Sequence, residues 1–156
     1  MTARVASVAP LLAAYRATTY RVRADGQVFD LRVGQPAATF AAWLQKRGID
    51  KFAIITAYNP GSRLLPAVEN AERQARLQAV LQARGWLAGE GENLADGSVW
   101  PIEPTCLAVG LSCQALRLLA IEYGQKAVLV GRGDAVPQLL WIEENERKNE
   151  QENRTF

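Results

Sequence analysis

The chain has 156 residues, 49% of them hydrophobic, and a formal net charge of +2. This length and composition are typical of one domain with a single core, and so small a charge gives no strong nucleic-acid-binding signal. No apolar run approaches the roughly 20 residues that cross a bilayer, so the sequence predicts a cytoplasmic protein without a membrane segment.

Histidine is absent from the sequence. This excludes Ser-His-Asp and Cys-His nucleophilic catalysis and every zinc site that needs an imidazole. The two cysteines, Cys106 and Cys113, do not make a disulfide framework and are expected to remain thiols in a reducing compartment. No metal site is predicted, although the composition leaves an all-carboxylate magnesium site open, and no cofactor is identified.

The first predicted elements are a short helix and a β-hairpin. Residues 8–18 have an apolar helical pattern around Leu11, Leu12 and Tyr15. Residues 20–33 alternate between apolar and polar side chains on either side of Asp25-Gly26, a favoured two-residue turn. The arginines of this hairpin are expected to lie on a solvated sheet face rather than to form an anion site.

A second helix is predicted over residues 36–47, with Trp43 in the core. Residues 52–57 then form a short β-branched run, which predicts a central strand covered on both faces. The run stops in a polar loop at residues 58–63, where Pro60 and Gly61 force the chain to turn. Because ligands often bind where a strand, a loop and a helix N-terminus meet, this junction is the predicted site.

The helix after this loop is predicted over residues 66–84, with Gly85 as its stop. Its spacing places Asn70 and Gln74 on the stripe that faces the sheet, and Arg73 on the solvated side with the other charged residues. A buried amide needs hydrogen-bond partners. The two amides therefore either brace the Asn59 loop or, for Asn70, contact a ligand.

Residues 86–88 are followed by a glycine-rich polar segment, residues 89–97, which is predicted to be a loop. In residues 98–105 two prolines flank Glu103. If Trp100 and Ile102 reduce the solvation of Glu103, its pKa rises, which suits acid/base work or a nucleophile. The alternative is that Glu103 accepts backbone hydrogen bonds or pairs with Arg63.

The last third of the chain is expected to hold a strand or buried turn at residues 106–111 and a helix capped by Ser112 that runs to Tyr123. This helix is apolar nearly all round, so it is packed centrally or covered by another chain. Cys113, in its first turn, is expected to be a buried structural thiol. Residues 125–130 and 138–142 predict two antiparallel strands, and residues 143–156 a charged flexible tail.

These elements predict an α/β or α+β fold. We expect a single domain over residues 1–142, with a mixed central sheet, an N-terminal β-hairpin and about four helices.

An ordered set of motifs runs through these elements. Its members are Tyr20, Thr56-Ala57-Tyr58-Asn59-Pro60-Gly61-Ser62, Asn70, Trp100-Pro101-Ile102-Glu103-Pro104 and Gly124-Gln125-Lys126-Ala127. Together they resemble a bacterial family known only as domain of unknown function 3293, and the resemblance spans roughly residues 20–140. The resemblance implies a single bacterial domain and points to the same loops, but it brings no established activity.

The first functional hypothesis is a module that binds a polar, nucleotide-like small molecule through amides and a hydroxyl, with an aromatic ring over one face. The second is an enzyme with Glu103 as nucleophile or general base. The third is a structural protein or homodimer that uses the apolar helix at residues 111–123. The expected ligand-binding residues are Thr56, Tyr58, Asn59, Ser62, Asn70, Trp100 and Gln125, and the expected catalytic residue is Glu103.

Overall fold

A computed structural model describes residues 10–97 and 100–142. Residues 10–16 are helical. The strands and helices that follow are β1 (Thr18–Ala24), β2 (Gln27–Leu31), α2 (Ala38–Lys46), β3 (Lys51–Ile55), the 3-10 turn η1 (Pro60–Ser62), α3 (Ala67–Ala83), β4 (Leu87–Ala95), β5 (Glu103–Val109), α4 (Cys113–Glu122), β6 (Ala127–Arg132) and β7 (Gln138–Trp141).

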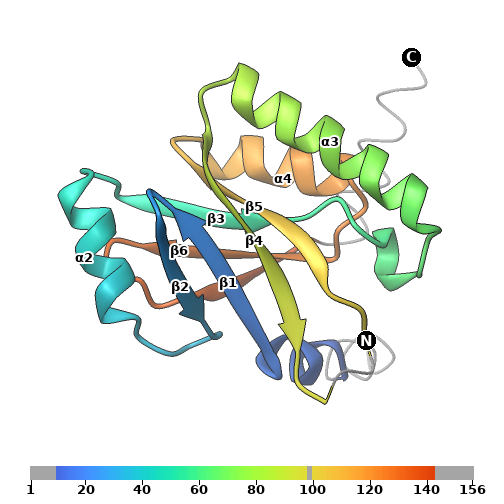
Figure 1. Cartoon of the computed structure of the whole chain (residues 1–156), viewed down its shortest axis with the longest axis horizontal. Coiled ribbons are helices and arrows are strands. Elements are labelled where there is room, and N and C mark those ends of the chain that lie inside the picture. Colours follow the sequence, from blue (N-terminus) through green and yellow to red (C-terminus); the bar gives the residue numbers. More distant parts are fainter. Residues whose placement is uncertain (1–9, 98–99, 143–156) are drawn as a thin grey trace.

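The strands form one curled seven-stranded sheet in the order β2-β1-β4-β5-β3-β6-β7 (Figure 1). Every pair of neighbouring strands is antiparallel. The described residues therefore form an α+β domain, and the predicted mixed sheet is wrong. Side-chain patterning reports which faces of a strand are buried, and a central antiparallel strand gives the same pattern as a parallel one.

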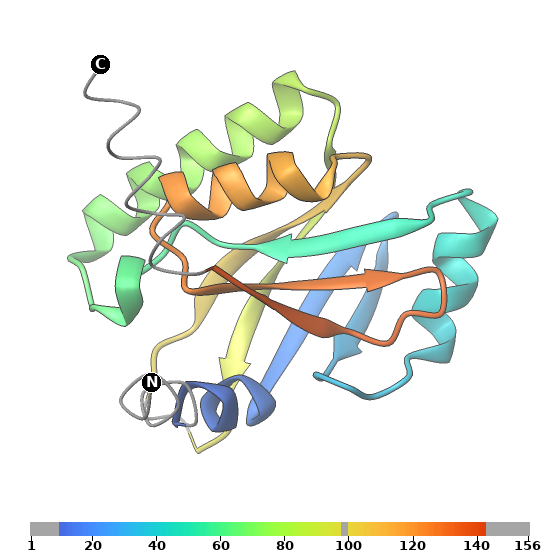
Figure 2. The ribbon, with the colours of Figure 1, turned by 180° about the vertical axis from the view of Figure 1, so that it is seen from behind.

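The helices divide between the two faces of the sheet. On one face α3 and α4 pack side by side, and their apolar side chains form a core with Ala53 and Ile55 of β3 (Figure 1). On the other face α2 packs at one end of the sheet through Phe40 and Trp43. The helical residues 10–16 lie toward the other end of that face (Figure 2). β3 is thus buried on both faces, as predicted.

Several local predictions are confirmed. The hairpin of β1 and β2 turns at Asp25 and Gly26, both in the left-handed region. Helix α3 follows Pro66 and ends before Gly85. The Ser112 hydroxyl caps α4 by accepting the Ala115 N–H at 3.1 Å. The predicted tail at residues 143–156 and the beginning of the first helix lie outside the described residues.

The predicted polar loop at residues 89–97 is wrong, because most of it belongs to β4, which pairs with both β1 and β5. In the sequence alone its glycines are typical of a turn, but in the structure they allow β1 and β4 to approach closely. A Cβ at Gly91 would lie 1.7 Å from the Arg21 carbonyl oxygen, and one at Gly89 would lie 2.5 Å from the Arg23 carbonyl oxygen. The glycines of β4 are thus explained by the close approach of the β1 backbone.

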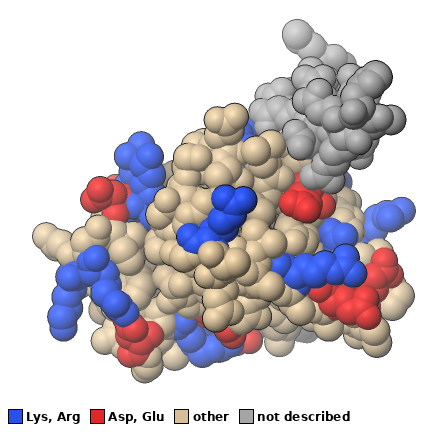
Figure 3. Space-filling model, turned by 90° about the horizontal axis from the view of Figure 1, so that it is seen from above, with Lys and Arg blue, Asp and Glu red and all other residues tan. Residues whose placement is uncertain are grey.

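The arginines of the hairpin pair with carboxylates, as expected for a solvated face. Arg21 donates to Asp30 at 2.9 Å, Arg23 to Glu92 at 2.8 Å, and the Arg32 guanidinium bonds Asp96 at 2.8 Å. Figure 3 shows basic and acidic side chains interspersed over the face seen from above. Among the described side chains visible on that face, no basic cluster gathers that would favour an anionic polymer.

Candidate functional site

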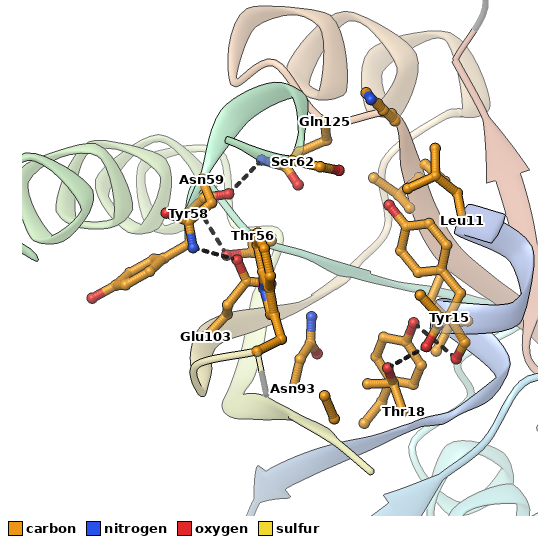
Figure 4. A pocket seen from close by; sticks show the side chains of 18 of the residues that line it. Leu11, Tyr15, Thr18, Thr56, Tyr58, Asn59, Ser62, Asn93, Glu103 and Gln125 are labelled. Atoms are coloured by element: carbon orange, nitrogen blue, oxygen red, sulfur yellow. Dashed lines mark hydrogen bonds between the residues drawn. The ribbon is translucent and has the colours of Figure 1, made fainter. Parts of the chain in front are cut away.

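A pocket of about 300 Å³ lies on the sheet face that α2 covers only in part. The polar loop after β3, the ends of β4 and β5, the segment before β6 and the helical residues 10–16 surround it (Figure 4). Seven predicted site residues line it: Thr56, Tyr58, Asn59, Ser62, Trp100, Glu103 and Gln125. Asn70, the other predicted residue, is not among the lining residues. The predicted site residues, which come from segments far apart in the sequence, therefore line one pocket.

The loop after β3 has an unusual backbone. Asn59 (φ 48°), Gly61 (φ 65°) and Ser62 (φ 61°) are all left-handed, a conformation that side-chain-bearing residues other than Asn and Asp rarely adopt. The loop is fixed from outside by the Gly61 N–H, which donates to the Gly124 carbonyl oxygen at 2.7 Å. A Cβ at Gly124 would lie 2.6 Å from the Pro60 Cβ, so only glycine fits against the loop here.

Asn59 is the centre of a buried hydrogen-bond network. Its Oδ1 accepts from Asn70 Nδ2 at 2.7 Å and from the Leu65 N–H at 3.0 Å. Its backbone N–H donates to Asn70 Oδ1 at 2.9 Å. Its Nδ2 donates to Glu103 Oε2 at 2.8 Å. Since Asn59 is only 4% exposed and its oxygen already has two donors, the structure uses it to hold the loop and to orient Glu103.

Gln74 braces the start of the same loop. Its Oε1 accepts the Ala57 N–H at 2.8 Å, and the Thr56 hydroxyl donates to the Pro104 carbonyl oxygen at 2.7 Å while it accepts the Tyr58 N–H at 3.1 Å. The buried amides of α3 thus tie down the loop, one of the two alternatives drawn from the sequence. The polar atoms of Thr56 are likewise occupied within the protein.

The prediction that the Arg73 side chain lies on the solvated side of α3 is wrong. Its Nε donates to the Ala57 carbonyl oxygen at 2.9 Å and its Nη2 to the Tyr123 carbonyl oxygen at 2.7 Å. The guanidinium also lies 5.8 Å from the centre of the Tyr123 ring. Helical spacing puts Arg73 beside the buried stripe, and its long side chain reaches both the Ala57 carbonyl group after β3 and the Tyr123 carbonyl group at the end of α4, where a cation is favoured.

The Gln125 side chain joins the loop to the segment before β6. Its Nε2 donates to the Tyr58 and Tyr123 carbonyl oxygens, each at 3.1 Å. The side chain is 8% exposed and also lines the pocket. It is therefore both a brace and a pocket-wall residue, with its Oε1 still able to accept a hydrogen bond.

Glu103 is half-buried in the pocket wall. Burial raises the pKa of its carboxyl above the usual range, and hydrogen bonds from Asn59 and Trp100 oppose this rise without cancelling it. No ion pair links Glu103 to Arg63 or to another cation in the part of the chain that the structure describes. The carboxylate therefore has polar support but no charge partner, and some of its acceptor positions remain open.

The raised pKa of Glu103 predicts a pH dependence of folding. The folded state holds the Glu103 proton more tightly than the unfolded chain does. In the unfolded chain the pKa of Glu103 is close to 4.5. The protonated group contributes stability below pH 4.5, and this contribution is lost as the pH rises through the folded pKa. We expect Glu103→Gln to unfold at higher urea than the unmodified protein at pH 7, with the difference vanishing at pH 4. An equal difference at both pH values would contradict this.

Sequence reasoning missed one wall of the pocket, which Tyr15, Thr18, Tyr20 and Asn93 form with apolar neighbours. In Figure 4 Tyr15 and Thr18 lie across the cavity from Glu103 and Thr56, and Asn93 lies between the two sides. Sequence reasoning missed these residues because it did not predict strand β4. In this strand Asn93 pairs with Tyr20 on one side and with Glu103 on the other. Of this wall, only Tyr20 was among the motif residues of the sequence.

A second pocket of about 450 Å³ lies between the beginning of α4 and strands β6 and β7. Its charged residues Lys51, Arg132 and Asp134 are exposed, and none of the predicted site residues lines it. Although this pocket is larger, its charged side chains are open to water, and the hydrogen-bond network around Asn59 contributes none of its described lining residues. The smaller pocket is the better candidate site.

One of the two cysteines differs from the expectation. Cys113 is exposed rather than buried, whereas Cys106 is buried, which raises the pKa of its thiol to about 12.

Within residues 10–97 and 100–142, no three His, Cys, Asp or Glu side chains cluster in a way that could hold a metal ion. In the same residues, no helix has the length and apolar character needed to span a bilayer.

Comparisons with known proteins agree with the resemblance stated above. No curated protein and no solved structure matches the chain. Residues 55–128, which contain the polar loop, α3, β4, β5 and α4, match the model of a family described as a protein of unknown function (DUF3293). The match is narrower than the motif-based span, but it includes all of the predicted site residues. The resemblance to domain of unknown function 3293 is thereby confirmed over this part of the chain.

Proposed function

We propose that this protein binds a small polar molecule of nucleobase or nucleoside size in the pocket that Glu103 lines. The observation that carries the proposal is a half-buried carboxyl group that is oriented by Asn59, has no cationic partner among the described residues, and lines a concave pocket. Burying a carboxylate costs free energy, and a bound ligand with hydrogen-bond donors would offset that cost.

The pocket volume supports a small ligand. At about 300 Å³ the pocket is at the lower end of the range typical of ligand sites. Its described lining residues include one basic side chain, Lys126, and one acidic side chain, Glu103. A triphosphate would find little neutralising charge there, so a base or nucleoside suits this lining better than the nucleotide-like ligand expected from the sequence.

The hydrogen-bond pattern separates residues that would contact the ligand from residues that would support the site. Asn59, Thr56 and Asn70 have their acceptors occupied inside the protein. Glu103 and Gln125 keep acceptor capacity that faces the pocket. We therefore assign ligand contact to the second pair and positioning to the first three.

A binding screen tests this proposal. Purified protein is mixed with nucleobases, nucleosides, sugars and metal ions, and melting temperatures are compared, since a ligand that binds only the folded state raises the melting temperature. We expect a hit whose affinity falls at least about tenfold in Glu103→Gln, because a charge-assisted hydrogen bond is lost. Glu92→Gln, on the neighbouring strand at an exposed ion pair, is the matched control and should leave affinity unchanged.

An absence of any stabilising compound across the whole screen would contradict the binding proposal. Equal loss of affinity in the Glu103 and Glu92 variants would also contradict it, because the effect would then be one of general charge rather than of the pocket.

A second candidate function is catalysis with Glu103 as general base or nucleophile. The raised pKa of Glu103 and its orientation by Asn59 favour this role. Once a ligand is known, Glu103→Gln should abolish its turnover even at ligand concentrations that saturate the variant. Turnover that is unchanged in this variant would remove Glu103 from the chemistry.

The proposed homodimer through α4 has less support. Leu116, Leu119 and Ala120 pack in the domain's own core, which accounts for most of the apolar character of the helix, whereas Leu118 is 43% exposed. Sedimentation over a range of protein concentrations tests it, and a monomer throughout would rule out the dimer.

A further inference from the structure

Three polar side chains form a row across neighbouring strands in the pocket. Asn93 of β4 is directly opposite Tyr20 of β1 and directly opposite Glu103 of β5. Residues that pair in this way across an antiparallel sheet point to the same face, with Cβ atoms about 5 Å apart. All three residues line the pocket. The Asn93 amide and the Glu103 carboxyl can therefore contact adjacent atoms of one ligand.

The Asn93 amide is not committed to the protein. Its Oδ1 is enclosed and has no hydrogen-bond partner. Figure 4 shows its nitrogen directed into the space between Glu103 and Tyr15. The amides of Asn59, Asn70 and Gln74, by contrast, all bond the loop. No hydrogen bond within the described residues occupies the Asn93 nitrogen either, so a ligand acceptor placed against this nitrogen would give the amide its first partner.

Glu103 supplies the complementary half of the pair. Asn59 holds its Oε2 at 2.8 Å, which fixes the carboxyl plane beside Asn93. The carboxylate accepts hydrogen bonds, whereas the Asn93 nitrogen donates them. A ligand that satisfies both must carry a donor next to an acceptor on one edge.

The walls around this pair are aromatic and aliphatic. Tyr15, Tyr20 and Trp100 line the pocket together with aliphatic side chains such as Ile54, whereas the Tyr58 ring points away from the cavity (Figure 4). The Tyr20 ring is 3% exposed and burial raises the pKa of its hydroxyl well above the usual range, so the ring is an uncharged wall at neutral pH. Aromatic and apolar walls favour a flat, weakly hydrated ring over a sugar.

We propose that the pocket takes a planar heteroaromatic ring with an N–H donor next to an acceptor, the donor bound by Glu103 and the acceptor by Asn93. Amino-substituted azines and cyclic amides carry this edge. The proposal rests on the proposed function, because it specifies which small molecules the same pocket accepts.

Four flat six-membered rings that carry different hydrogen-bonding edges test the ligand class. 2-Aminopyrimidine and 2-pyridone carry donor and acceptor together, whereas pyrimidine has acceptors only and aniline has a donor only. Each is titrated into ¹⁵N-labelled full-length protein, and affinity is read from the shifts of backbone amide signals around the pocket. We expect the first two to bind about tenfold more tightly than the second two, since each half-edge leaves one polar group of the site unpaired.

Variants of Asn93 make the test specific. Asn93→Leu removes both polar atoms at similar size, and we expect 2-aminopyrimidine to bind about tenfold more weakly. Asn93→Asp replaces the donor by a second acceptor. This variant should reverse the preference, with weaker binding of 2-aminopyrimidine and tighter binding of benzamidine, a flat cation with two donors. Glu92→Gln, at the adjacent position on the opposite face of β4, should change neither affinity.

The outcomes separate this inference from the proposed function. Pyrimidine and aniline binding in the pocket as tightly as 2-aminopyrimidine would overturn the edge requirement and leave the pocket a ligand site. A folded Asn93→Asp variant with unchanged preference would overturn the role of Asn93. If no molecule of the wider screen shifts the pocket signals, both the inference and the proposed function fail.

Discussion

Replacing Gly91 with alanine is expected to destabilise the folded protein by at least about 4 kcal/mol, a loss at the exceptional end for one substitution. The added Cβ would lie 1.7 Å from the Arg21 carbonyl oxygen and 2.8 Å from its carbonyl carbon. These are backbone atoms of a paired strand, so no side-chain rotation relieves the overlap, and β1 must separate from β4. Because small domains are stable by only about 5–15 kcal/mol, this loss removes a large fraction of the free energy of unfolding.

Urea unfolding followed by circular dichroism measures this loss. Gly97→Ala is the matched control, since Gly97 also belongs to the end of the β4 region but a Cβ there meets nothing within 4 Å. Its positive φ of 77° should cost only about 1 kcal/mol. Equal urea midpoints for the two alanine variants would show that the close approach of β1 and β4 does not limit residue size at Gly91.

The second large effect is expected for Asn70→Ala, which should cost about 2–4 kcal/mol and also weaken ligand binding. The substitution leaves the Asn59 N–H without its acceptor and removes one of the two donors to Asn59 Oδ1. Asn70 is 4% exposed, so water does not readily replace these bonds. Asn59 would then no longer be held where it orients Glu103.

Gln78→Ala is the control for Asn70→Ala, because Gln78 is an amide on the same helix whose bond to Glu90 lies at the surface. We expect it to change the free energy of unfolding by no more than about 0.5 kcal/mol. Stability comes from urea unfolding and binding from the fragment titrations. If Asn70→Ala unfolds at the same urea concentration as Gln78→Ala, the network around Asn59 is not a major source of stability.

Local signals predicted the parts of the candidate site that follow from chain geometry. Pro60 and Gly61 placed the turn, and helical spacing placed Asn70 and Gln74 against the sheet. These predictions succeeded because they depend on backbone restrictions and on the 3.6-residue period, which act over a few residues. The same reasoning failed for Arg73, whose position beside the buried stripe allows its long side chain to reach two backbone carbonyl groups.

The wall that includes Asn93 could not be predicted in this way. Gly89, Glu90, Gly91, Glu92 and Asn93 have little intrinsic preference for a strand, and they form one because β1 and β5 pair with them on both sides. That pairing brings together residues separated by long stretches of sequence. Hydrophobic patterning carries no information about such partners, so a segment rich in glycine and glutamate resembles a loop.

The sequence by itself determined the N-terminal hairpin, the helices, the doubly buried strand β3 and the polar loop that follows it, since each depends on local backbone preferences or on the period of its apolar residues. The tertiary structure alone decided that all neighbouring strands are antiparallel, that β4 lies between β1 and β5, and that Asn93 stands beside Glu103. The physical reason is that strand order and cross-strand register depend on contacts between distant segments, which become fixed only when the whole sheet assembles.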